Sequence, residues 1–259
     1  STQKENISTK IAELNEFFNQ EVFPQIPDSI ISRIQGLKLT INFNDKSEHN
    51  GLFIPDEINK NHKIIIQLIQ LNSNGLKALL AHEFFHAVHY ELNPNESPWI
   101  REGLAQVFEF MVTNELNGGN LRAAISDPLT PLIGTYHLES PIPAQYGHNM
   151  LYFYYLYKHC GEASLFWDIT MGQQGLKDTE LLNTILKNDF SVFPKHENAI
   201  EFADVKKYFL HEIDTYKVVF IDGVFSSFLS STTHDGIDVC LMSSALNKPK
   251  YKMVIDTYF

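Results

Sequence analysis

One helix is more strongly specified than any other part of this 259-residue chain. Residues 76–92 read LKALLAHEFFHAVHYEL, follow the turn-forming sequence NSNG, and stop before Pro94, which cannot continue a helix. Within this segment, Leu76, Leu80 and Phe84 form an apolar stripe at helical spacing. The chain is therefore expected to fold around this helix, with one of its faces buried.

The same helix carries the sequence H-E-x-x-H. His82 and His86 are four residues apart and lie on one helix face, where both imidazoles can reach a single ion. Imidazole nitrogens at about 2.0–2.1 Å suit zinc. Glu83 can take a proton from a zinc-bound water, because the metal lowers the pKa of that water toward about 7. The motif predicts one catalytic Zn²⁺ and hydrolytic chemistry.

A catalytic zinc ion takes three protein ligands and leaves one position for water. The metzincin continuation H-E-x-x-H-x-x-G-x-x-H fails, because its last two fixed positions are His89 and Leu92. The better third ligand is Glu102 in the run WIREGLA, 16 residues beyond His86 and early in the next predicted helix. Gly103 would let that second helix pack closely on the first, so that a short loop returns Glu102 to the ion.

HEFFH followed by WIREGLA resembles the gluzincins, thermolysin-like zinc metallopeptidases whose ligands are two histidines and a glutamate. The pattern looks closest to hyicolysin-like bacterial members, which have a W-x-x-E-G-x-A step and a later Y-G pair, here Tyr146-Gly147. The resemblance covers residues 76–157. It implies a zincin-type catalytic domain and endopeptidase or aminopeptidase activity on peptide or protein substrates.

The resemblance leaves open which residue accepts a hydrogen bond from a ligating histidine and so orients its ring. In the thermolysin type, an aspartate four residues after the glutamate ligand accepts a hydrogen bond from that histidine. Here the position is Gln106, whose carbonyl could accept with less charge. Glu109 lies on the same helical face, about one turn further, and is the alternative. Such partners orient the ligand and tune the metal.

Groups on the substrate side are also implied by the resemblance. Gluzincins commonly use a tyrosine or histidine to stabilise the oxyanion of the tetrahedral intermediate. Tyr146 is the first candidate, with His148 and the pair Tyr136-His137 as rivals. A peptide substrate would add by strand pairing to an edge strand, for which residues 64–69 are the natural candidate.

The remaining pattern predicts an α+β chain. A helix is expected over residues 7–23, followed by three strands, 37–43, 51–54 and 63–69, in a small mixed or antiparallel sheet. Six further helices are expected over residues 76–92, 97–116, 146–159, 162–171, 177–187 and 199–216. A β-rich tail, residues 217–259, follows them. Residues 120–145 are expected to form a long loop. The catalytic domain would span 1–216, with a sheet part (1–72) and a helical part (73–216), and 217–259 would be a C-terminal β-rich segment.

Net charge and hydrophobicity restrict the classes of binding partner that the chain is expected to have. The formal net charge of −11 argues against binding to nucleic acid, and no apolar run reaches the 18 residues that a membrane span needs. Two cysteines, Cys160 and Cys240, do not decide whether a disulfide forms. Because the chain begins with Ser1 and the resembling peptidases are mostly secreted, a secreted or periplasmic location is expected.

Two alternatives differ in function from a general peptidase. The chain could be a binding or toxin-like module with a structural or vestigial zinc site, in which the tail beyond residue 217 serves recognition. It could also be a protease that is specific for one protein target. The presence of the base and of all three proposed ligands argues against a vestigial site.

Overall fold

The computed structural model describes residues 2–44, 49–58, 61–67, 69–70, 73–126, 143–159 and 162–188. These residues are mainly helical and include one three-stranded sheet, so the predicted α+β class is confirmed. The chain divides into two compact units. The first comprises the residues up to Leu92 together with Phe108–Glu115, and the second comprises Asn93–Val107 and the described residues from Leu116 onward.

Four consecutive helical segments open the first unit: α1 (Thr2–Phe17), the π-helical turn η1 (Phe18–Val22), the 3-10 turn η2 (Phe23–Gln25) and α2 (Asp28–Arg33). The predicted helix over residues 7–23 is therefore present, and its regular part ends at Phe17. Pro24 lies at the start of η2, where its missing N–H costs no helical hydrogen bond. Val22 and Ile30 are buried and anchor this region to the core.

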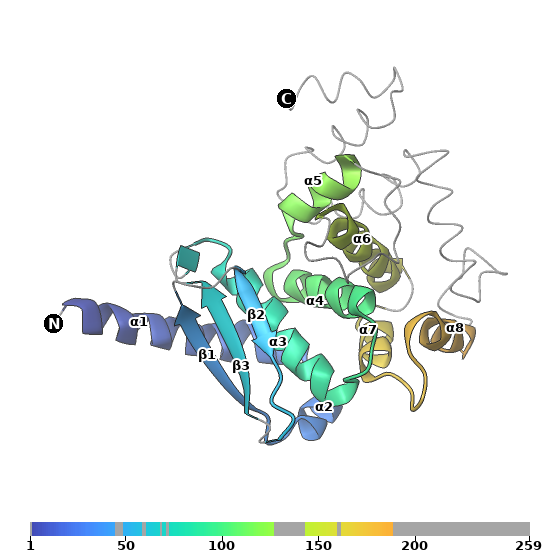
Figure 1. Ribbon diagram of the computed structural model, residues 1–259, viewed down its shortest axis with the longest axis horizontal. Coiled ribbons are helices and arrows are strands. Elements are labelled where there is room, and N and C mark those ends of the chain that lie inside the picture. The colour runs from blue at the N-terminus through green and yellow to red at the C-terminus, as the bar shows by residue number, and fades with distance from the viewer. Residues whose placement is uncertain are drawn as a thin grey trace, which may run out of the picture. The chain divides into compact units, whose positions relative to one another are not determined.

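The sheet of the first unit has the order β1-β3-β2, with strands Lys38–Asn44 (β1), Asn61–Gln67 (β3) and Gly51–Ile54 (β2) (Figure 1). β1 runs parallel to β3 and β2 runs antiparallel to it, so the sheet is mixed. Because β3 is paired on both sides, the prediction that residues 64–69 form a substrate-binding edge is wrong. In the described sheet the edges are β1 and β2.

Helix α3 has the predicted bounds, Leu76–Leu92, and packs against β2 and β3. Most of its apolar side chains are buried, and Leu80, Ala81 and Phe85 are almost completely excluded from solvent. In β3, the inward-facing Ile64 and Ile66 are also fully buried. The period-2 pattern of the strand and the 3.6-residue pattern of the helix thus meet in one apolar layer.

Side-chain hydrogen bonds fasten the segment after β2 to the end of α3. His62 Nδ1 accepts from the backbone N–H of Asp56 at 2.9 Å, so Nε2 carries the proton and donates to Glu91 Oε1 at 2.8 Å. Beside this pair, the Tyr90 hydroxyl donates to Glu57 Oε1 at 2.8 Å. This hydrogen bond, followed by burial and the nearby carboxylates, raises the pKa of Tyr90 because each favours the neutral phenol.

Helix α4 spans Pro98–Thr113 and passes from the second unit into the first. It ends before the predicted position because Asn114 adopts a left-handed conformation, with φ of 58°. Gly118 and Gly119 lie just beyond the predicted end of this helix at residue 116, and they begin α5 (Gly118–Ser126). Part of the predicted loop over residues 120–145 is therefore helical, and residues 127–142 lie outside the described residues.

Three further helices complete the described part of the second unit: α6 (Pro143–His159), α7 (Glu162–Met171) and α8 (Asp178–Asn188). They match the predicted helices closely. None of the described helices is long and apolar enough to cross a membrane. The predicted helix over 199–216, the β-rich tail with its boundary at 216/217, and both cysteines lie outside the described residues.

The start of α4 depends on a buried carboxylate. Glu96 is 3% exposed, and its carboxylate accepts hydrogen bonds from the backbone N–H groups of Ser97 and Asp178, each at 2.7 Å. The Asn93 side-chain amide donates a third hydrogen bond at 3.1 Å. Ser97, the first residue of the predicted helix, lies just before α4, and within the described residues its Oγ makes no hydrogen bond. Glu96 satisfies the backbone of this turn instead.

Replacing Glu96 with alanine is expected to lower the free energy of unfolding by about 2–4 kcal/mol, because two backbone N–H groups lose their buried acceptor. Glu115→Ala, which truncates an exposed carboxylate just beyond α4, should change it by less than about 0.5 kcal/mol. Urea unfolding measures both. Equal stability of the two variants would contradict this role of Glu96.

Candidate metal centre

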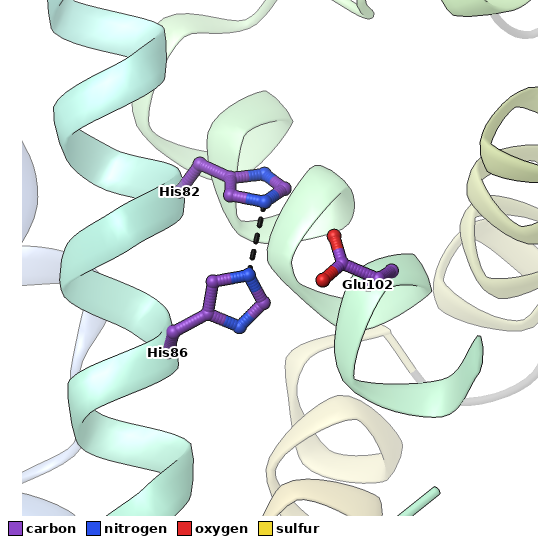
Figure 2. Close-up of side chains that lie close together, drawn as sticks. All are labelled: His82, His86 and Glu102. Atoms are coloured by element: carbon purple, nitrogen blue, oxygen red, sulfur yellow. Dashed lines mark hydrogen bonds between the residues drawn. The ribbon is translucent and has the colours of Figure 1, made fainter. Parts of the chain in front are cut away.

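Two imidazoles on α3 face one another. His82 Nε2 and His86 Nε2 lie 3.0 Å apart, and the two rings meet edge to face with centroids 4.7 Å apart (Figure 2). Both residues are partly exposed. The i, i+4 spacing therefore does what the sequence predicted, because it directs one nitrogen of each ring toward the same point.

The orientation of the His82 ring is set by Glu109. His82 Nδ1 and Glu109 Oε1 lie 2.6 Å apart, and the Glu109 side chain is 8% exposed. A carboxylate only accepts hydrogen bonds, so Nδ1 is the donor and the lone pair of a neutral His82 lies on Nε2, which faces His86. Glu109 thus presents His82 as a ligand, as such partners do at metal sites.

Gln106, the other candidate for the residue that orients a histidine, forms its hydrogen bonds with other groups. Its side-chain amide donates to the carbonyl oxygen of Tyr146 at 3.0 Å, and its Oε1 accepts from Asn120 at 2.7 Å. These bonds tie α4 to α5 and α6 within the second unit. The choice that the sequence left open between Gln106 and Glu109 is therefore resolved in favour of Glu109.

Glu102 joins the two histidines. It lies seven residues before Glu109 on the same continuous helix, which places the two carboxylates on one helix face about 10 Å apart along the axis. One ligand atom from each of Glu102, His82 and His86 lies within 4.8 Å of the others. In Figure 2 the Glu102 carboxylate lies on the same side of α3 as both imidazoles.

The donor set fits a metal ion. Two nitrogens bound tetrahedrally at about 2.0–2.1 Å from zinc lie about 3.3 Å apart, close to the 3.0 Å between the two Nε2 atoms. Two imidazoles and one carboxylate suit a divalent transition metal better than calcium or magnesium, which prefer oxygen ligands. The three residues therefore form a group that can hold a metal ion, with part of each side chain open to solvent.

Gly103 has a different role from the one predicted. A Cβ at this position would collide with the ring of Phe153 on α6, so the glycine allows close packing of α4 on α6 rather than on α3. This contact lies next to Glu102 in the sequence. Gly103 therefore lets α6 hold the turn of α4 that carries Glu102, the third candidate ligand.

The proposed catalytic residues occupy different places. Glu83 is buried, at 6% exposure, and its carboxylate lies beside Gly51 of β2, a residue that the sequence pattern did not single out. Tyr146 and His148 are both on α6, where Tyr146 is partly exposed and His148 is 2% exposed. Their catalytic roles remain predictions, and Tyr136 and His137 lie outside the described residues.

Comparison of the chain with protein-family models, with curated proteins and with solved structures gave no match.

Replacing Glu109 with glutamine is expected to weaken metal binding by about 10- to 100-fold, since His82 loses the carboxylate that orients its ring. Competition titrations with a chelator, using Zn²⁺ and Co²⁺ as probes, measure the affinity. Glu91→Gln is the matched control, because it changes a histidine–carboxylate pair between His62 of β3 and Glu91 of α3 that does not involve the candidate ligands. Equal loss of affinity in both variants would refute the specific role of Glu109.

Proposed function

We propose that this protein is a zinc-dependent peptidase of the gluzincin type. The observation that supports it most is the meeting of His82, His86 and Glu102, because these are the three ligands expected from the H-E-x-x-H motif and the WIREGLA step. Zinc is the expected ion, since two imidazoles and a carboxylate form a common donor set of catalytic zinc sites. When bound, zinc supplies a Lewis acid that polarises a carbonyl group and lowers the pKa of a water molecule.

Side chains of the protein would then transfer the protons of the reaction and stabilise the developing charge. Glu83 accepts a proton from the water that attacks the scissile peptide carbonyl, and it later donates that proton to the leaving amine. Tyr146 donates a hydrogen bond to the carbonyl oxygen as negative charge develops there. Tyr146 is preferred to His148 for this step because His148 is almost completely buried.

A catalytic site is favoured over a structural one by the number of ligands. Structural zinc sites are nearly always closed by four protein ligands, whereas catalytic sites use three and keep one position for water or substrate. Among the described residues, the candidate group contains three side chains, all of them partly exposed. This supports a hydrolase over a binding module whose metal only holds the fold together.

Zinc is expected to stabilise the metal-free protein. At a free concentration one hundred times the dissociation constant, one bound ion contributes about 2.7 kcal/mol to the free energy of unfolding. Thermal melts should therefore shift upward with Zn²⁺ and not with Mg²⁺ or Ca²⁺, and the shift should disappear in His86→Ala. An equal response to Mg²⁺ would argue against a nitrogen-rich site.

Glu83→Gln is expected to retain one zinc ion per chain and to lose about 10²- to 10⁴-fold in kcat, because the amide cannot accept the proton. Cleavage is measured by mass spectrometry on a broad peptide library, so that narrow specificity does not hide activity. Glu91→Gln, on the same helix, should keep its kcat. Full turnover by zinc-loaded Glu83→Gln would sink the proposed mechanism.

A further inference from the structure

Strand β2 carries no side chain at the point where it meets α3. A Cβ built on Gly51 would lie 2.5 Å from Glu83 Oε1 and 2.9 Å from Glu83 Cγ, well inside van der Waals contact. Leu79 Cδ1 would also lie close to this Cβ, at 2.8 Å. The buried carboxylate of Glu83 thus occupies the space that a side chain at position 51 would fill.

The backbone at Gly51 does not itself require glycine. Among the described residues, the glycines with positive φ are Gly36, Gly172 and Gly175, so Gly51 has a conformation that other residues also adopt. Glycine weakens a strand, because it loses more conformational freedom on folding than alanine and offers no side chain for packing. Alanine at this position would favour the strand, and its absence calls for another reason.

The atoms that an added Cβ would meet, Glu83 Cγ included, all belong to two side chains and none to the backbone. Neither the Glu83 carboxylate nor the Leu79 methyl belongs to the backbone, so both can rotate away without unfolding α3 or β2. The cost of Gly51→Ala therefore falls on the position of the Glu83 carboxylate rather than on the fold. Displacing a reacting group by about 1 Å can cost about 10²-fold in rate.

We infer that Gly51 is a positioning residue, which leaves the space that sets the place of the Glu83 carboxylate. The inference rests on the proposed role of Glu83 as proton acceptor. The contact itself can be tested without turnover. Strand stability at the edge of the sheet is lowered so that an acidic side chain of α3 can lie against the strand.

The first experiment is a thermal double-mutant cycle on the metal-free protein. In a Glu83→Ala background, Gly51→Ala is expected to raise Tm by about 1–4 °C, because the strand gains from alanine and no carboxylate is in the way. With Glu83 present, the same substitution should raise Tm less or lower it. The matched control is Gly75→Ala, whose Cβ would meet nothing closer than Ser73 Oγ at 3.9 Å. It should shift Tm equally in both backgrounds.

The second experiment uses the zinc-loaded enzyme. Gly51→Ala is expected to bind one zinc ion as the unmodified protein does, and to lose about 10- to 100-fold in kcat with KM nearly unchanged. Gly75→Ala should retain full activity.

The outcomes separate the two ideas. If Gly51→Ala shifts Tm by the same amount with and without Glu83, or if it retains full kcat with zinc bound, Gly51 does not position Glu83. If the thermal cycle shows the expected coupling but the unmodified protein cleaves no peptide, the placement of Glu83 stands and the proposed peptidase function fails.

Discussion

The short hydrogen bond between His82 and Glu109 is the interaction on which the candidate site depends. It joins α3 to α4 within one compact unit, where the stacked rings of Phe85 and Phe108 pack beside it. A histidine that donates through Nδ1 has its other nitrogen available as a ligand. One contact therefore chooses the tautomer of His82 and fixes the helix that also carries Glu102.

The other end of α4 is held by quite different forces. The buried Glu96 carboxylate satisfies the backbone where the helix begins, and Gln106 ties the middle of the helix to the backbone of α6. Glu102 lies between these two supports. A flexible glutamate gains precision as a ligand when its backbone is held on both sides, because less conformational entropy is lost on binding.

Local signals in the sequence were sufficient for α3 and for the three residues of the candidate metal group, and they failed where packing decides. The helix over residues 76–92 has turn residues before it and a proline after it, so local sequence signals predict both of its ends. No such signal predicts the order of the strands, and β3 proved to be the central strand. Similarly, the early end of α4 depends on the conformation of Asn114, and the role of Glu109 depends on Gln106 being bound to α5 and α6.

Three sides of α3 make three different contacts. One side faces α4 through its histidines, another faces β2 through Glu83, and a third contacts the opening helices, where Phe84 meets Phe18. Lys77 is the single exposed residue in the helix. Neutral drift over evolutionary time is consequently confined to a very small part of this helix, so relatives of the protein should keep its sequence while the surrounding scaffold diverges.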